Sequence, residues 1–590
     1  MPKTPRYLIT THDERTWEFD RPVIFLGEWC RLFERKNIWE NMDAIVAEPY
    51  GLGLVNKDAD NAEARMLEEN LFLILCNILN QQNNLQHEER FWRITLGHWL
   101  RCYVNIIVNR VKTLEKFMQM YQISGTKTYL NNSYILATKN SISMTWASND
   151  PHWNNVLIMR ILDLLGTKFP VDYIKVDDSL SFQISFLDPL KKRILKWVYR
   201  QLQKLLSFIS KDSDAFIISS YLPKKVEIKL QIALRQFPQF WISPTFEISE
   251  KYDLKLRRKL SNQIRNKSKN YLENILSEML FELLPICYLE GFPNITDLAQ
   301  KQSWPKYPKF IFTSNNFDTD ELFKVWLATK VESGSKYFAG QHGSNYGTHR
   351  YINRTIEEVT AERFITWGWK DELCQHTPAF IFKTAEAKNA NYNSQGFLLL
   401  VELCIDHRVT IWDDYAEFNN YFKEQNDFVS LLSSAVKKQL IIRLPAAHKN
   451  FKWNEEARWK AFDSSLKIDN GSSNLVNLIS QSRLVVYSYD STGMLENLSK
   501  NIPTVVFWQN NFDHLRDQAK PFYQALVDAE ILHLTPVSLT KKINKIWNDI
   551  DYWWNENKVQ EARKYFCEKY ARQSKNPVCE LKKILIGGAS

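Results

Sequence analysis

The order of apolar and polar segments along the chain predicts an α/β protein. In the last third of the sequence, short apolar runs predict buried strands at 397–405, 439–444, 484–487 and 504–507. Segments with helical periodicity alternate with these runs, near 426–437, 493–500, 517–529, 537–549 and 559–571. This alternation is typical of a doubly wound parallel sheet, because each helix carries the chain back to begin the next strand in the same direction.

The first two thirds of the chain alternate less regularly. Apolar runs predict strands at 6–10, 23–26, 127–136, 142–147, 309–313, 337–340 and 363–367, and helical stretches are predicted at 63–117 and 189–289. A polar segment without periodicity predicts a linker at 385–396. The sequence therefore predicts two Rossmann-like domains that face a cleft. They are an N-terminal domain over 1–384 with a helical elaboration at about 189–290, and a C-terminal domain over 397–575, followed by a tail over 576–590.

Composition narrows the class of protein. A chain of 590 residues is too long for one hydrophobic core, which agrees with two large domains. The net charge of +9 is too small and diffuse to predict a nucleic-acid partner. The eight cysteines show no CxxC spacing, and no ligand-like spacing follows His342 and His349. We therefore expect neither a disulfide framework nor a metal or other cofactor.

Apolar and basic segments bear on the location of the protein. No apolar run approaches the length that spans a bilayer, and no apolar leader precedes the first predicted strand, so a cytoplasmic protein is expected. In the predicted helix 190–209, basic residues line one face and apolar residues another, and 251–269 carries a second basic cluster. Such helices either bind an anionic surface, which would give peripheral contact with the inner membrane, or pack on their own domain.

The segment 484–508 carries the clearest candidate chemistry. Its pattern predicts a strand, a polar turn, a short helix and a second strand. The hydroxyls of Ser491 and Thr492 and the backbone N–H of Gly493 then gather at a helix N-terminus, where unpaired N–H groups and the helix dipole favour a phosphate. Glu496 follows one helical turn later, placed to accept hydrogen bonds from a ribose. A helix cap alone is the other interpretation of the two hydroxyls.

Several motifs together resemble one family. They are Tyr-Leu-Ile-Thr-Thr (7–11) with Glu-Arg-Thr-Trp (14–17), Phe-Leu-Gly-Glu-Trp-Cys (25–30), Phe-Trp-Arg (91–93) with Gly-His-Trp-Leu (97–100), Gly-Gln-His-Gly (340–343) with Tyr-Gly (346–347), Trp-Gly-Trp (367–369) and the loop 490–503. Over nearly the whole chain they resemble a family of bacterial transferases of the GT-B type, encoded in O-antigen and surface-polysaccharide clusters. The family pattern has proline where this chain has His98.

The resemblance implies a metal-independent glycosyltransferase. Its partners would be a nucleotide sugar and a glycan or lipid-linked acceptor. A looser likeness links the chain to transferases that use CMP-activated ulosonic acids, because Arg443 and His448 follow one strand of the C-terminal domain and Ser491-Thr492 follow the next. The His-Pro order of those enzymes is not reproduced here.

Placement just after predicted strands suggests roles for several polar residues in such an enzyme. A glycosyltransferase must stabilise a leaving phosphate and activate an acceptor hydroxyl. The predicted donor-binding residues are Gln341, Gly343, Arg443, His448, Ser491, Thr492, Gly493 and Glu496. The predicted catalytic residues are Glu28, Glu14, His342 and Asp318. Glu28 is the first candidate for the base. His342 either contacts the leaving phosphate, acts as a general acid, or is simply structural.

Other functions fit the same pattern. Asp318 is also expected to be the N-cap of a helix at 318–329. The sequence leaves open whether the enzyme inverts or retains configuration. A teichoic-acid-type phosphotransferase shares the two-domain layout and a similar histidine loop, and a nucleotide-sugar epimerase shares the C-terminal loop. A non-catalytic glycan-binding scaffold of the same shape is the alternative from another class.

Overall fold

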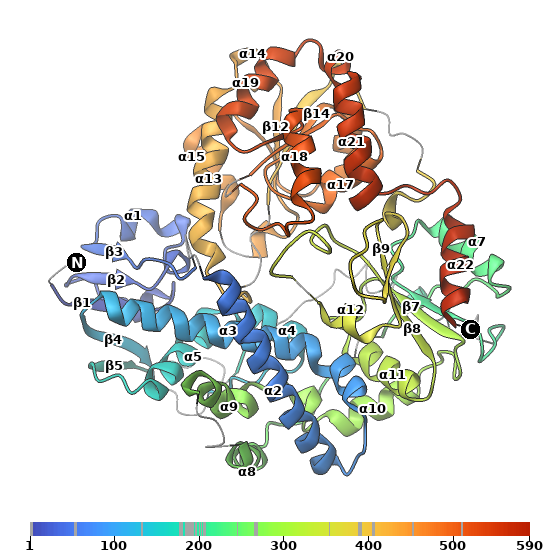
Figure 1. Cartoon of the computed structure of the whole chain (residues 1–590). Helices are drawn as coiled ribbons and strands as arrows, with labels where there is room; N and C mark the ends of the chain where they lie inside the picture. Colours follow the sequence, from blue (N-terminus) through green and yellow to red (C-terminus); the bar gives the residue numbers. More distant parts are fainter. Residues whose placement is uncertain are drawn as a thin grey trace.

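Three parallel β-sheets organise the chain (Figure 1). The computed structural model describes residues 4–51, 56–130, 134–175, 181–182, 194, 197–199, 201, 203, 208–244, 246–264, 270–352, 354–387, 392–403, 408–450, 453–508 and 511–589. Every pairing between the named strands is parallel. We call the parts built on the three sheets the N-terminal, middle and C-terminal units.

The N-terminal unit is built on a doubly wound sheet. Its strands are β1 (Arg6–Ile9), β2 (Val23–Phe25), β3 (Ala44–Val46), β4 (Ile123–Tyr129) and β5 (Val171–Ile174), in the order β3-β2-β1-β4-β5. The two long helices α2 (Lys57–Asn83) and α3 (Glu89–Met120) connect β3 to β4. They extend from this sheet toward the middle unit, where α3 packs against α11 (Glu321–Glu332) and α12 (Ile356–Thr360) (Figure 1).

The middle unit has its strands in sequential order. They are β6 (Phe216–Ile218), β7 (Phe310–Thr313), β8 (Lys336–Gly340), β9 (Arg363–Thr366) and β10 (His376–Pro378), in the order β10-β9-β8-β7-β6. A separate apolar cluster packs between this sheet, α7 (Lys224–Ala233) and α22 (Pro577–Ala589). The C-terminal helix thus returns from the C-terminal unit to cover the middle sheet (Figure 1).

The C-terminal unit has the strand order of a dinucleotide-binding fold. Its strands are β11 (Phe397–Val401), β12 (Leu440–Arg443), β13 (Lys467–Asp469), β14 (Ser482–Tyr487), β15 (Thr504–Phe507) and β16 (Leu532–His533), in the order β13-β12-β11-β14-β15-β16. The chain reverses direction across the sheet between β11 and β14. In open α/β sheets, ligands bind beyond the carboxyl ends of strands at such a switch point.

Helices complete the three units. Those of the N-terminal half are α1 (Lys36–Trp39), α4 (Ser141–Ala147), α5 (Pro151–Leu164), α8 (Leu254–Ile264), α9 (Tyr271–Leu283) and α10 (Phe292–Gln300). Those of the C-terminal unit are α13 (Asp414–Leu431), α14 (Ser434–Lys437), α15 (Glu455–Phe462), α16 (Leu475–Gln481), α17 (Thr492–Ser499), α18 (Lys520–Asp528), α19 (Pro536–Ile546), α20 (Ile550–Trp554) and α21 (Asn557–Tyr570). Within the described ranges, no helix is long and apolar enough to cross a membrane.

The structure confirms the α/β class and corrects parts of the predicted layout. The chain before the linker forms two sheets, where one was predicted, and the stretch 189–290 contains β6, the first strand of the second sheet. Residues 142–147, predicted as a strand, are helical in α4. There Asn140 caps the helix by accepting a hydrogen bond from the Ser143 N–H, and this local cap outweighs the strand-like run of alternating residues.

The remaining predictions of layout have mixed outcomes. The predicted linker contains no helix or strand among its described residues, whereas the predicted tail is helix α22. Most of the predicted helix 190–209 lies outside the described residues. In the second basic segment, Arg257 is 1% exposed and pairs with Glu290 at 2.6 Å between Nη2 and Oε2. That arginine therefore serves packing within the unit and does not face a membrane.

Candidate active site

The segment 484–508 has the predicted local structure, with a helix that begins at Thr492. The hydroxyl of Ser491 accepts a hydrogen bond from the Met494 N–H at 3.0 Å, so Ser491 is the N-cap of the helix. A Cβ on Gly493 would lie 2.6 Å from the Tyr487 hydroxyl oxygen, so only glycine fits this first turn against the buried tyrosine. The strand, turn, helix and second strand predicted for this segment are therefore confirmed.

The loop after β8 meets the N-terminus of α17. The Ser344 N–H donates to Oγ1 of Thr492 at 3.1 Å, which joins the middle unit to the C-terminal unit. Gln341 orders this loop. Its side-chain oxygen accepts from the Trp367 N–H at 3.0 Å and from the Trp369 indole at 2.8 Å. Its amide nitrogen donates to the carbonyl of Gly343 at 2.8 Å, so Gln341 holds the loop from inside the protein.

A cavity of about 370 Å³ lies where the three units meet. Helices α2 and α3 contribute Asn61, Arg65, His98, Arg101 and Asn105 to its lining. The loops after β7 and β8, and the segment through α12, contribute Phe317, Asp318, His342, Tyr346, Tyr351, Ile352, Thr355, Ile356 and Glu357. The segment before α13 contributes Thr410, Ile411 and Trp412. His342 lies one residue before Gly343, whose neighbour Ser344 contacts Thr492, so the cavity adjoins the N-terminus of α17.

Four side chains form a polar network in the wall of this cavity. The Tyr346 hydroxyl donates to Oε1 of Glu357 and lies 3.2 Å from Nδ1 of His342. The other carboxylate oxygen of Glu357 lies 3.3 Å from Nε2 of His98. Polar contacts therefore run from His342 through Tyr346 to Glu357, and His98 of helix α3 lies beside the free oxygen of Glu357 without a hydrogen bond to it.

Burial sets the protonation of this network. Desolvation raises the pKa of Glu357 to about 7, because little solvent stabilises the carboxylate. The hydrogen bond from Tyr346 lowers this pKa, but burial outweighs it. Burial, with the nearby charge of Lys383, lowers the pKa of His342 to about 4, and burial also lowers the pKa of His98 well below its usual range. Both imidazoles are therefore neutral at neutral pH, whereas Glu357 titrates near it.

Asp318 lines the cavity and is not the cap that the sequence predicts. Helix α11 begins at Glu321, and its N-cap is Asp320, which accepts a hydrogen bond from the Phe323 N–H at 3.1 Å. The carbonyl of Asp318 accepts from Nζ of the buried Lys324 at 3.0 Å, which fixes the loop. Burial raises the pKa of the Asp318 carboxyl.

The two other acids predicted as catalytic lie elsewhere, in the N-terminal unit. Glu28 pairs with Arg31 at 2.5 Å, and Glu14 pairs with Arg35 at 2.5 Å. Neither glutamate lines the cavity. The structure thus brings His342 and Asp318 together and places Glu28 and Glu14 in ion pairs outside this site.

The predicted donor-binding residues of the C-terminal unit are also engaged with protein partners. Arg443 donates to the carboxylate of Asp469, and Nδ1 of His448 lies 2.9 Å from the carbonyl oxygen of Pro445. Glu496 pairs with Lys383 of the middle unit at 3.2 Å. The Glu496 pair is a further link between helix α17 and the middle unit.

Sequence reasoning missed two cavity residues, one from the long helix α3 and one from the short helix α12. His98 lies in the middle of α3, and Glu357 lies in a short helix that begins with a capping box at Thr355. One local signal was available. Gly97 precedes His98, and a Cβ there would lie 2.9 Å from Cγ2 of Ile356, so this glycine lets α12 approach α3 closely.

The fold and the cavity define an α/β protein with a polar site between three parallel-sheet units. A family model matches residues 6–585, and the chain belongs to that family, the LIC12162 family transferases. The transferase part of the predicted resemblance is therefore confirmed. No curated protein matches the sequence significantly.

Searches of solved structures find distant likenesses. The spinosyn rhamnosyltransferase SpnG complexed with thymidine diphosphate is 12% identical, with a TM-score of 0.29, and 63% of this chain and 99% of that chain are covered. The wall teichoic acid polymerase TagF is 10% identical, with a TM-score of 0.31 and coverages of 68% and 96%. MnaA of S. aureus with UDP is 13% identical, with a TM-score of 0.31 and coverages of 61% and 91%. These scores are too low to argue from.

Proposed function

We propose that this transferase is a GT-B-type glycosyltransferase that moves a sugar from a nucleotide-activated donor to a hydroxyl of a glycan or lipid-linked acceptor in bacterial surface-polysaccharide synthesis. The observation that carries the proposal is the contact between Ser344 and Thr492. It brings a helix N-terminus suited to phosphate next to the cavity that holds His342. A donor phosphate at α17 would then adjoin an acceptor in the cavity.

In this proposal His342 is the general base. The single proton of the Tyr346 hydroxyl goes to Glu357, so the tyrosine oxygen accepts from Nδ1–H of His342. In this tautomer Nε2 of His342 carries the lone pair. With the pKa of His342 lowered to about 4, that nitrogen is unprotonated at neutral pH and can take the proton of an acceptor hydroxyl. Glu357 would stabilise the imidazolium that forms.

Charge in the cavity favours an anionic substrate. Arg65 and Arg101 share one carboxylate, that of Glu68. Burial lowers the pKa of Arg65 to about 10, which still leaves its guanidinium charged at neutral pH. The pair therefore leaves positive charge beside the cavity, suited to a phosphate or a carboxylate. A lipid-linked acceptor carries phosphate and an ulosonic acid donor carries a carboxylate, so both candidate substrates remain part of this proposal.

Nucleotide binding tests the donor site. We expect a rise in melting temperature with one of CMP, CDP, UDP, GDP or dTDP, independent of added magnesium, because a ligand that binds only the folded state stabilises it. Ser491→Gly combined with Thr492→Val should abolish that rise. Glycine is chosen because it replaces a serine N-cap at a cost of only a few tenths of a kcal/mol. Ser480→Ala, which changes an exposed hydroxyl on α16, is the control and should bind as the parent does.

Product analysis separates the remaining alternatives. A glycosidic product that disappears in His342→Ala supports the proposal, and a phosphodiester-linked product would instead identify a phosphotransferase. A nucleotide sugar converted without any acceptor would identify an epimerase. If no nucleotide shifts the melting temperature and glycan assembly in cells tolerates His342→Ala, the protein is a binding scaffold and the proposal is wrong.

A further inference from the structure

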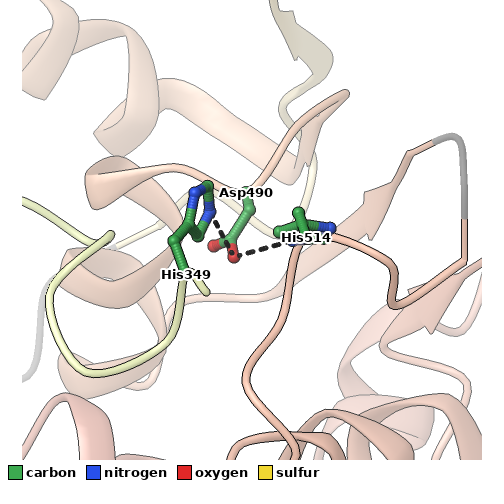
Figure 2. A group of neighbouring side chains, drawn as sticks. All are labelled: His349, Asp490 and His514. Atoms are coloured by element: carbon green, nitrogen blue, oxygen red, sulfur yellow. Dashed lines mark hydrogen bonds and ion pairs between the residues drawn. The ribbon is translucent and has the colours of Figure 1, made fainter. Parts of the chain in front are cut away.

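A second polar cluster lies beside the N-terminus of α17 and is separate from the lining of the cavity. It consists of His349, Asp490 and His514 (Figure 2). His349 belongs to the loop after β8 of the middle unit, Asp490 immediately precedes Ser491, and His514 follows β15. Figure 2 shows both imidazoles directed at the same carboxylate oxygen, which is Oδ2 of Asp490.

We propose that these three residues bind a divalent transition-metal ion of the Zn²⁺ type. Two imidazole nitrogens and one carboxylate oxygen are a donor set that zinc prefers, and three protein ligands leave a fourth position for water. Local sequence spacing predicts no metal site, because the three residues lie far apart along the chain. This inference does not depend on the proposed transferase reaction.

The distances fit a metal site. Ligand atoms about 2.1 Å from a tetrahedral ion lie about 3.4 Å from one another. Nε2 of His514 lies 3.4 Å from Oδ2 of Asp490, and Nε2 of His349 lies 3.7 Å from it. All three ligand atoms lie within 4.8 Å of one another. Shifts of an ångström or less in the side chains would therefore complete the coordination.

Unsatisfied atoms point to a missing ligand. Oδ1 of Asp490 and Nε2 of His349 are buried and make no hydrogen bond within the described structure, and the Asp490 side chain is only 5% exposed. A buried polar atom without a partner is costly. A metal ion would satisfy Nε2 of His349 directly, and a carboxylate that bound it through both oxygens would also satisfy Oδ1 of Asp490. The Tyr523 hydroxyl already donates to Oδ2 of Asp490 at 2.8 Å, as an outer partner that orients a metal ligand does.

The backbone holds the cluster across two units. The Arg350 N–H donates to the carbonyl of His514 at 2.9 Å, and the Arg516 N–H donates to the carbonyl of Thr348 at 2.7 Å. These bonds pair the two histidine-bearing segments as a short antiparallel bridge. A metal there would fix the loop after β8 against the segment that precedes α17. Its role would be structural, so the transfer reaction itself need not use it.

Metal content and cobalt absorption test the site. The full-length protein, without a histidine tag, is stripped with a chelator and dialysed against Zn²⁺, and we expect about one ion per chain. Co²⁺ should give the visible absorption of a tetrahedral site. The spectrum should lack a thiolate charge-transfer band, which would appear if the exposed Cys374 or Cys579 bound the ion instead.

Variants make the assignment specific. His514→Gln should weaken Zn²⁺ binding by more than about 100-fold, and Tyr523→Phe, which keeps every ligand, by about 10-fold. The matched control is His87→Gln, because Nδ1 of His87 also lies beside a carboxylate, at 2.6 Å from Glu332. Among the described residues, no third metal-ligating side chain joins this pair. If His514→Gln is misfolded by circular dichroism, Tyr523→Phe decides. Absence of stoichiometric metal in the parent, or equal binding by all variants, would overturn the proposal.

Discussion

Glu357→Gln tests the cavity network most directly. Burial raises the pKa of Glu357 from 4.5 to about 7 in the folded protein. A carboxyl with a raised folded-state pKa holds its proton more tightly when folded, so the folded state loses stability as the pH rises from about 4.5 to about 7. A shift of about 2.5 units corresponds to about 3 kcal/mol above that range. Glutamine cannot ionise and avoids this loss.

The expected result is a difference that depends on pH. At about pH 8 the variant should be more stable than the parent by up to about 3 kcal/mol. An imperfectly paired amide reduces this gain by about 1 kcal/mol. The difference in stability should nearly vanish by about pH 5. Thermal unfolding of both proteins across this range measures it, since other titrating groups cancel. Transfer activity should fall, because the imidazolium of His342 loses its carboxylate.

Two outcomes would refute the reasoning about Glu357. A stability difference that stays constant across the pH range would show that its carboxyl titrates normally. Unchanged activity would remove Glu357 from the proposed mechanism. Glu372→Gln is the matched control, because that side chain is 70% exposed and should give no pH-dependent difference.

Two further predictions concern packing. Gly493→Ala should destabilise the C-terminal unit by about 1–3 kcal/mol, because its Cβ would lie 2.6 Å from the hydroxyl oxygen of buried Tyr487. Thermal unfolding should show that adding Tyr487→Phe to this variant recovers part of the lost stability. Arg257→Met should lower the free energy of unfolding by about 3–5 kcal/mol, because it leaves Glu290 buried without its partner. Arg257→Met combined with Glu290→Gln should lower it by less, and urea unfolding measures both changes. Equal costs would contradict the ion-pair argument.

The local patterns of the sequence determined the elements and one half of the site. Apolar runs bounded by turn residues locate most strands of the C-terminal sheet, and the hydroxyls and glycine at Ser491–Gly493 predict the start of helix α17. Such features are set by neighbouring residues, through helix caps and periodicity, so a sequence is enough to find them. Short strands such as β13 and β16 were missed because two or three residues give no periodic signal.

Tertiary structure alone decided what these elements form together. Strand β6 could extend the first sheet or begin another, and only its pairing with β7 shows that it begins the middle sheet. Likewise, His98 meets Glu357 because α3 packs against α12, and His349 meets Asp490 because two units dock. These contacts join residues more than a hundred positions apart. They depend on how packed surfaces fit, which no local pattern of residues records.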